Sequence, residues 1–303
     1  MPTRSGVAVL GTGLLGGKVA ERLATHGGAG PVTVWNRTES KARALEACGC
    51  AVAGSASAAL AGAEVAVLFL ADYAAAESVV LAAPDDAVRG LHVLQMGTIG
   101  VSESTMLCEA LKERGAASYC EAPVQGSKGE ALKGELLVML GADEPPAEGS
   151  AVGGVLRCLA GGRVTHCGPV GAGAAAKLAT NQLLAAIQVG FSTSLGMVEA
   201  AGVPVERWME VVRPSALYCK QLDKKLPAML AREFGNPNFP TAHMLKDVRL
   251  AEGAAEAAGL HTAAVGGLRG ALEKACEDAG LRDADYSAVY AGVAGKRKRD
   301  QSQ

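Results

Sequence analysis

Residues 7–16 read VAVLGTGLLG, and this stretch decides the fold. Its first four residues are all apolar, which is typical of a short strand buried on both faces of a parallel sheet. A glycine-rich turn follows directly, and apolar residues then recur at helical spacing at Leu14, Val19 and Leu23. The stretch therefore predicts a strand, a tight turn and a helix in immediate succession.

The turn has the spacing G-x-G-x-x-G at Gly11, Gly13 and Gly16. In this setting the first glycine permits the tight turn, the second lets backbone approach a pyrophosphate, and the third lets helix pack on strand. The phosphates would lie at the helix N-terminus, where free N–H groups favour an anion. A purely structural turn is the alternative. The candidate cofactor-binding residues of the turn are Gly11, Thr12, Gly13, Leu14, Leu15 and Gly16.

The same alternation continues outward from this stretch. Apolar runs that read as strands are separated by segments of helical periodicity, the pattern of a parallel sheet with helices on both faces. We expect a Rossmann-type doubly wound α/β domain over residues 1–170. The predicted strands are 7–10, 32–35, 64–70, 92–96, 117–123, 135–141 and 163–168, and the predicted helices are 39–48, 56–63, 73–83 and 102–114.

A second, all-α domain is expected over residues 171–303, beginning with a long interdomain helix at 172–201. Polar residues such as Lys177 and Gln188 interrupt this helix, so its apolar run falls short of the ~20 residues that a membrane span needs. We expect no membrane span, but a helix buried between domains or between the subunits of a homodimer or homotetramer. The later predicted helices are 205–212, 217–233, 241–258, 261–279 and 284–294.

Composition narrows the class of protein. Of the 303 residues 49% are hydrophobic and 20% charged, which excludes global disorder, and a net charge of −2 provides no basic field for nucleic acid. The eight cysteines form no C-x-x-C pair and no zinc spacing, which predicts free thiols in a reducing compartment and no metal site. The N-terminal MPTRSG runs straight into the first strand, so we expect no targeting segment and a cytoplasmic protein. The C-terminal AGKRKRDQSQ reads as a solvated tail.

Residues 34–38, VWNRT, indicate which dinucleotide is bound. A site for NAD has Asp or Glu at the end of the second strand, where the carboxylate accepts from the ribose 2′-hydroxyl. No carboxylate stands here. Arg37 can pair with a 2′-phosphate, and Asn36 and Thr38 can add hydrogen bonds. These residues favour NADP(H) as the cofactor.

A second glycine-rich segment, EAPVQGSKG at 121–129, follows a predicted strand and precedes a helical segment. Successive backbone N–H groups in such a turn form a concave anion site, which would suit a small carboxylate substrate. A plain glycine-rich turn is the alternative.

A third segment, GPVGAGAAAKLATN at 168–181, places Lys177 and Asn181 four residues apart on one helical face near the domain junction. A desolvated ammonium can donate a hydrogen bond or a proton to a carbonyl oxygen as a hydride reaches the carbon. Asn181 would orient the lysine or hold the substrate oxygen. A lysine that snorkels from the edge of an apolar helix is the alternative.

Four motifs, in order, resemble the β-hydroxyacid dehydrogenase family, which includes 3-hydroxyisobutyrate dehydrogenase, and more closely its glyoxylate/succinic semialdehyde reductase branch. They cover nearly the whole chain: GTGLLGGKVAERL (11–23), EAPVQGSKGEALKGEL (121–136), GPVGAGAAAKLATN (168–181) and FPTAHMLKDVRLA (239–251). The resemblance implies NADPH-dependent reduction of small aldehydo or keto acids, such as glyoxylate or succinic semialdehyde, to hydroxyacids. Two alternatives are the NAD(P)-dependent oxidation of a 3-hydroxyacid such as 3-hydroxyisobutyrate, and a non-catalytic dinucleotide-binding scaffold.

The resemblance also implies roles for individual residues. The family's catalytic lysine matches Lys177, its helper asparagine matches Asn181, and a threonine on the nicotinamide side, next to substrate, matches Thr98. A solvated charged helix face is the alternative for residues 243–249. The remaining matches are Gln125, Gly126 and Ser127 in the substrate-carboxylate loop, Lys246 for the cofactor, and Phe239 and Asp247 for the substrate.

Two positions depart from the family's usual residues. The carboxylate loop usually begins Ser-Gly, whereas here it begins with Gln125 and Gly126, so a hydroxyl contact is lost and a longer amide enters the pocket. The residue before Thr98 is commonly Ser and here is Gly97. Because the backbone N–H groups remain, anion binding survives both changes, but the choice of substrate is left open.

Overall fold

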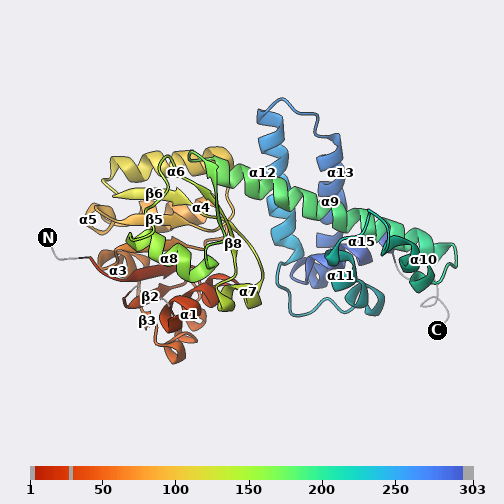
Figure 1. The fold of residues 1–303 in the computed structure, drawn as a ribbon, viewed down its shortest axis with the longest axis horizontal. Helices are drawn as coiled ribbons and strands as arrows, with labels where there is room; N and C mark the ends of the chain where they lie inside the picture. Colours follow the sequence, from red (N-terminus) through yellow and green to blue (C-terminus); the bar gives the residue numbers. More distant parts are fainter. Residues whose placement is uncertain (1–3, 27–29, 296–303) are drawn as a thin grey trace. The chain divides into compact units, whose positions relative to one another are not determined.

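The computed structural model describes residues 4–26 and 30–295. The first three residues and nearly all of the charged tail predicted to be solvated lie outside this range. The chain forms two compact units, Met1–Leu178 and Ala179–Gln303 (Figure 1). Their boundary falls inside the long helix α9 (Ala172–Ala200), and each unit is described by itself below.

The first unit is built on a nine-stranded sheet with the order β3-β2-β1-β4-β5-β6-β8-β7, and β9 pairs with β8. Strands β1 to β6 are parallel, as the sequence predicts, whereas β8 runs antiparallel to both β6 and β7, a reversal that it does not predict. The predicted strands are observed as β1 (Val7–Leu10), β2 (Val32–Trp35), β4 (Val65–Leu68), β5 (His92–Gln95), β6 (Ser118–Glu121), β8 (Leu137–Gly141) and β9 (Val164–Gly168). Two more, β3 (Ala51–Val52) and β7 (Val124–Gln125), are too short to leave a sequence pattern.

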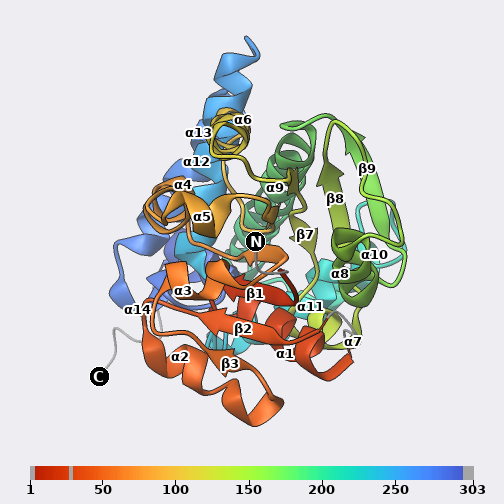
Figure 2. The same ribbon diagram turned by 90° about the vertical axis from the view of Figure 1, so that its left-hand side faces the viewer.

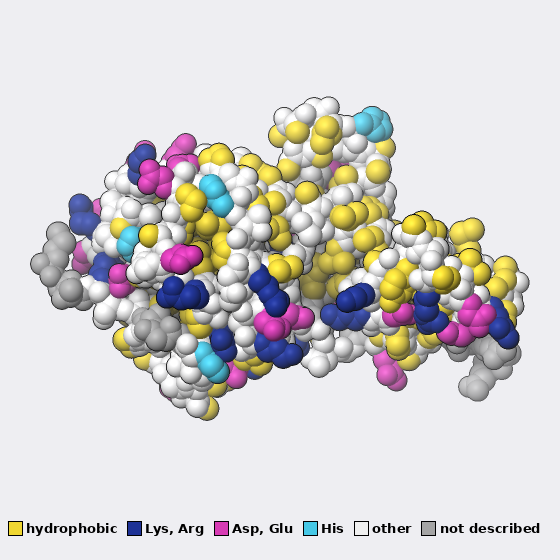
Figure 3. Space-filling view, viewed as in Figure 1, with side chains coloured by type: hydrophobic (Ala, Val, Ile, Leu, Met, Phe, Trp, Pro, Cys, Tyr) yellow, Lys and Arg dark blue, Asp and Glu magenta, His cyan; other side chains and the backbone are white. Residues whose placement is uncertain are grey.

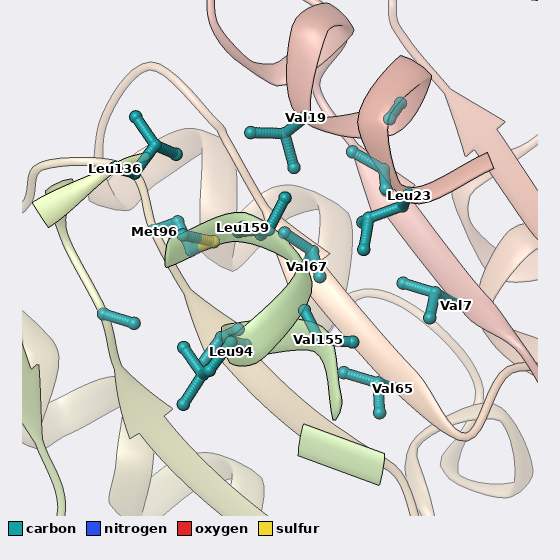
Figure 4. Packing of buried hydrophobic residues seen from close by; sticks show 14 of the residues in the cluster. Val7, Val19, Leu23, Val65, Val67, Leu94, Met96, Leu136, Val155 and Leu159 are labelled. Carbon is teal, nitrogen blue, oxygen red and sulfur yellow. The ribbon is translucent and has the colours of Figure 1, made fainter. Parts of the chain in front are cut away.

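Helices cover both faces of this sheet (Figure 2). Val7 and Val9 of β1 enter one hydrophobic core, and Ala8 and Leu10 enter the other, so the strand is apolar at every position because it is buried on both sides. The first core packs the sheet against α1 (Gly16–His26), α2 (Glu39–Arg43), α7 (Lys128–Lys133) and α8 (Ala151–Ala160), as Figure 4 shows for α1 and α8. The second core lies under α3 (Ala56–Ala61), α4 (Tyr73–Ala76), η2 (Glu77–Leu81), α5 (Asp85–Val88) and α6 (Val101–Glu113).

The strand order reverses at β1, which has β2 on one side and β4 on the other. In open α/β sheets the crevice beyond the carboxyl ends of the strands at such a reversal is where ligands bind. The predicted glycine turn follows β1 at this point. Because β2, β5 and β6 run parallel to β1, the segments that follow them begin at the same edge of the sheet. The fold therefore gathers several of the candidate residues there.

The second unit is helical, and its described part contains no strand; Pro240 and Asp285 form one isolated bridge. Besides the rest of α9 it contains α10 (Val205–Val212), α11 (Lys220–Ala231), α12 (Thr241–Ala257), α13 (Ala263–Cys276), α14 (Ala279–Arg282), η3 (Tyr286–Ala288) and α15 (Val289–Ala294). Within the described residues α9 is the one helix long and apolar enough to cross a membrane, a test that core helices of soluble proteins also pass. Phe191 and Leu195 of α9 are buried in the core of this unit. The ring of Phe191 stacks on that of Trp208, with 5.7 Å between the ring centroids.

Candidate active site

The glycine turn after β1 has the shape that its spacing predicts. Gly11 adopts a φ of +93°, and a Cβ at this position would lie 2.3 Å from the carbonyl oxygen of Phe69. A Cβ at Gly16 would lie 2.0 Å from the carbonyl oxygen of Gly11, so helix and strand approach too closely for any side chain. Both glycines are therefore required by the fold itself.

Gly13 differs, because a Cβ there would meet nothing within 4 Å. The turn thus leaves open space beside exposed backbone at the N-terminus of α1, whose first turn holds no acidic side chain. Next to it the hydroxyl oxygen of Thr12 is buried, with no hydrogen-bond partner among the described residues. An open cradle with uncompensated N–H groups fits the pyrophosphate of a dinucleotide. The backbone of Gly13, Leu14 and Leu15 would hold it.

The segment after β2 carries one bridging residue and two exposed ones. The Asn36 side-chain oxygen accepts from the N–H of Thr12 at 3.0 Å, and its amide nitrogen donates to the carbonyl oxygen of Thr38 at 3.0 Å. Asn36 therefore ties the glycine turn to the end of β2, a structural role that the sequence does not predict. Arg37 and Thr38 are exposed, and the Arg37 guanidinium makes no hydrogen bond or ion pair within the described residues. The next carboxylate along the chain, Glu39, pairs with Arg43 at 2.5 Å.

The turn after β5 explains one departure from the family's usual residues. A Cβ at Gly97 would lie 2.6 Å from the carbonyl oxygen of Leu70, so glycine is imposed by the close approach of the segment after β4. Thr98 follows half-buried, beside the buried Gln95, whose amide nitrogen donates to the carbonyl oxygen of Gly97 at 3.0 Å. The side-chain oxygen of Gln95 has no partner in the described part of the chain.

The predicted carboxylate loop begins inside a strand. Gln125 belongs to β7, where it pairs with Leu137 of β8, and Gly126 then starts the turn into α7. The N–H of Ser127 donates to the Glu130 carboxylate at 2.8 Å, and its hydroxyl donates to the same oxygen. Ser127 is thus the N-cap of α7, and its donors serve the helix. Next to this cap, Gly126 is exposed and Gln125 is half-buried.

Lys177 lies on α9 and is 8% exposed. Its ammonium donates to the carbonyl oxygen of Val124 at 2.8 Å. A narrow hollow beside it is lined by Lys177, Thr98, Gln95, Gly97, Ile99, Glu121, Pro123 and Ala174. The first unit therefore brings together the predicted lysine and the predicted threonine, at the edge of the sheet that carries the glycine turn.

Asn181, one helical turn after Lys177 on α9, is buried in the second unit. Its amide nitrogen donates to the Asp247 carboxylate at 2.5 Å, and the other oxygen of Asp247 pairs with the Lys246 ammonium at 2.8 Å. Asp247 on α12 is itself buried, so it holds two predicted site residues in place. Phe239 lies just before α12 and packs edge-on against Tyr286, with 5.9 Å between ring centroids.

Comparisons with known proteins agree with this geometry. Residues 6–168 match the family model described as the NAD binding domain of 6-phosphogluconate dehydrogenase. Residues 171–293 match the model described as NAD-binding of NADP-dependent 3-hydroxyisobutyrate dehydrogenase. The chain belongs to the β-hydroxyacid dehydrogenase family.

Individual relatives extend this result. The chain is 30% identical to glyoxylate/succinic semialdehyde reductase 2 of Arabidopsis thaliana, over 97% of this chain and 81% of that protein. It is 29% identical to an NAD-dependent L-serine dehydrogenase of Pseudomonas aeruginosa, over 93% of this chain and 96% of that protein. The solved 3-hydroxyisobutyrate dehydrogenase of Mycobacterium tuberculosis, with L-serine, superposes with a TM-score of 0.83 at 26% identity, covering 97% of this chain and all of that one.

Membership of the family indicates the class of reaction. Its members are oxidoreductases that act on CH–OH groups with a nicotinamide dinucleotide. The similarity to them supports NAD(P)-dependent hydroxyacid dehydrogenase activity for this chain. The geometry adds positions that sequence reasoning passed over. Glu121 and Gln95 are buried polar residues that line the hollow with Lys177, and each is the last residue of a mostly buried strand. A charged or amide side chain at the end of a buried strand is the signal that could have found them.

Two glycine substitutions separate the fold of the turn from its cradle. Gly16→Ala places a methyl group against the Gly11 carbonyl and should lower the free energy of unfolding by about 1–3 kcal/mol. Gly13→Ala meets only open space and should leave the melting temperature unchanged, but weaken dinucleotide binding by about tenfold or more, because its methyl group occupies the cradle. Thermal unfolding and fluorescence titration with NADPH and NADH measure both effects. Unchanged affinity in Gly13→Ala would show that the pyrophosphate lies elsewhere.

Proposed function

We propose that this protein is an NADPH-dependent reductase of small aldehydo or keto acids, with glyoxylate and succinic semialdehyde as first candidates. The observation that carries the proposal is the buried Lys177 ammonium, held by the Val124 carbonyl and lining one hollow with Thr98. The similarity to plant glyoxylate/succinic semialdehyde reductases supports the substrate class.

When bound, NADPH supplies the hydride that reaches the carbonyl carbon of the substrate. Lys177 then stabilises the negative charge that develops on the carbonyl oxygen and donates the proton that completes the hydroxyl group. Because water is largely excluded around this side chain, its charge acts more strongly on that oxygen than it would in bulk water. Asn181, oriented by Asp247, holds the substrate oxygen or the lysine.

The substrate carboxylate is placed in this proposal at the turn after β7. The Gly126 backbone and the Gln125 side chain supply the contacts, since the Ser127 donors already serve Glu130. Because the Gln125 side chain is longer than the serine usual in the family, the proposal places the choice of substrate at this end of the loop. Clamping the carboxylate fixes the angle at which the carbonyl carbon meets the hydride.

Oxidation of a 3-hydroxyacid by the same groups is the second candidate function. It is favoured by relatives named 3-hydroxyisobutyrate dehydrogenase and L-serine dehydrogenase. In that direction neutral Lys177 would accept the proton of the substrate hydroxyl. Assays with glyoxylate and succinic semialdehyde plus NADPH, and with 3-hydroxyisobutyrate and L-serine plus NADP⁺ or NAD⁺, compare the two directions by kcat/KM. A higher kcat/KM for oxidation at every pH would overturn the reductase proposal.

Lys177→Ala removes the proposed acid. Turnover should fall by at least ~10²-fold, the usual scale for a positioned acid, while the Kd of NADPH stays within about threefold. Lys112→Ala, which alters an exposed lysine on α6, is the matched control and should leave turnover unchanged. Near-normal turnover of Lys177→Ala would remove the lysine from the mechanism.

The preference for NADPH is assigned to Arg37, which is exposed after β2 where no carboxylate stands. Arg37→Glu introduces a carboxylate that repels a 2′-phosphate and can accept from a ribose hydroxyl, so the NADPH/NADH ratio of kcat/KM should fall by about 10²-fold or more. Arg207→Glu, at an exposed position on α10, should leave the ratio unchanged. An unchanged ratio in Arg37→Glu would show that another residue reads the phosphate.

We propose a homodimer or homotetramer that lies in the cytoplasm and binds neither nucleic acid nor membrane. All eight cysteines are free thiols, which suits a reducing compartment. Basic and acidic side chains are mixed on the face shown in Figure 3, so this face offers nucleic acid no continuous basic surface. Hydrophobic side chains also gather along the α9 and α10 end of the second unit in that view.

The subunit contact is assigned to α9. Leu183 and Met197 are 58% and 68% exposed and stand four helical turns apart, with exposed Gly190 between them. A second copy would cover this apolar face. Light scattering should give a mass two or four times 30.6 kDa, and the double variant Leu183→Glu/Met197→Glu should lower it. Met106→Glu, on α6, is the control. A wild-type mass of one chain would overturn the assignment.

A further inference from the structure

We propose that Glu121 is a positioning residue that sets the place of Lys177, an inference that rests on the function proposed above. Glu121 is the last residue of β6 and is 1% exposed. A carboxylate so deeply buried is costly unless its charge is compensated, so its surroundings show what it serves.

The carboxylate binds the start of α9. One oxygen accepts from the backbone N–H groups of Gly171 and Gly173, both at 2.7 Å. Gly171 directly precedes the helix and Gly173 lies in its first turn, where N–H groups lack partners and the helix dipole favours a negative charge. Glu121 therefore anchors the first turn of the helix that carries Lys177.

The other oxygen is held by a short chain of hydroxyl groups. It accepts from the Ser104 hydroxyl at 2.5 Å, and the Ser104 oxygen lies 2.7 Å from the Tyr119 hydroxyl. Since the Ser104 hydroxyl donates its hydrogen bond to the carboxylate, the Tyr119 hydroxyl donates to the Ser104 oxygen. Burial raises the pKa of Tyr119, so the phenol keeps the proton that this contact needs. The carboxylate is thus fixed from both sides.

Two glycines make room for the Glu121 side chain and for the start of α9. A Cβ at Gly141 would lie 2.0 Å from the Glu121 carboxylate oxygen. A Cβ at Gly173 would lie 2.6 Å from the carbonyl oxygen of Met139 in β8. Glycines on strand and helix therefore let the carboxylate and the first turn of α9 pack against β8 without side chains between them.

The same segment of chain also holds the lysine. Gly173 and Lys177 are four residues apart and so lie on one helical face, and Val124, which accepts from the Lys177 ammonium at 2.8 Å, is three residues after Glu121. Glu121 and Lys177 line the same hollow with Thr98. Residues 121–124 thus fix the helix backbone with a carboxylate and the ammonium with a carbonyl. A small misplacement of an acid from its substrate oxygen can cost as much as ~10² in rate.

Two substitutions separate the reach of the side chain from its charge. Glu121→Asp keeps the charge but withdraws the carboxylate from the helix, so kcat with NADPH and glyoxylate or succinic semialdehyde should fall by about 10–100-fold, with the KM for NADPH within about threefold. Glu121→Gln still presents an oxygen to Gly171 and Gly173, and the Ser104 hydroxyl can turn to accept from the amide, so kcat should fall less than tenfold. Glu135→Asp, at a partly exposed position, is the control and should change nothing.

A double-mutant cycle with Lys177→Ala tests whether the effect passes through the lysine. If Glu121 only positions Lys177, Glu121→Asp should cause no further loss of kcat in the Lys177→Ala background. Ser104→Ala, which removes one hydrogen bond to the carboxylate, should show a smaller fall in kcat with the same dependence on Lys177. It serves as the test if Glu121→Asp does not fold.

Three outcomes would overturn the inference: unchanged kcat in Glu121→Asp, equal losses with and without Lys177, or a parallel loss of kcat, NADPH affinity and melting temperature. These are distinguishable from failure of the proposed function. That failure would appear as near-normal turnover of Lys177→Ala itself. If Lys177→Ala instead loses most of its turnover, and Glu121→Asp lowers kcat by the same factor with and without Lys177, the lysine mechanism stands and only the positioning role of Glu121 is overturned.

Discussion

The parallel pairing of β1 with β2 on one side and β4 on the other is the constraint on which the first unit depends. It buries VAVL on both faces and brings the carboxyl ends of the neighbouring strands to one edge. The turn that leaves β1 must then pass so close to Phe69 that Gly11 and Gly16 have no substitute. The open cradle at Gly13 and the segments that carry Arg37 and Thr98 follow from that pairing.

Polar groups that look alike in the sequence fall into two classes in the structure. Glu121, Asn36 and Asp247 spend their hydrogen bonds on other parts of the protein: the first turn of α9, the glycine turn and the side chain of Asn181. Arg37 extends from an exposed segment, and Lys177 keeps its ammonium at the edge of a hollow. The first class binds other parts of the protein because a buried polar group without a partner would destabilise the fold.

The order of strands and helices could be predicted from the sequence because apolar periodicity records burial on each face. The glycine turn and the four motifs that mark the family were readable for a related reason, since backbone close approach and helix-face spacing are local properties. The sequence alone shows Gly97 only as a departure from the family, and it predicts Ser127 as part of the loop that binds the substrate carboxylate. Contacts with Leu70 and Glu130 give both residues structural explanations instead.

The sequence by itself determined a dinucleotide-binding α/β unit followed by helices, and it singled out Lys177 as the residue for the chemistry. Only the tertiary structure decided that β8 runs against its neighbours, that a carboxylate at the end of β6 anchors the first turn of α9, and that Asp247 binds Asn181. The physical reason is range. Periodicity and turn chemistry act over a few residues, whereas the contacts of Glu121 and Asp247 join groups 50 and 66 positions apart in the chain. The direction of β8 depends on the strands with which it pairs, β6 and β7, and not on its own residues.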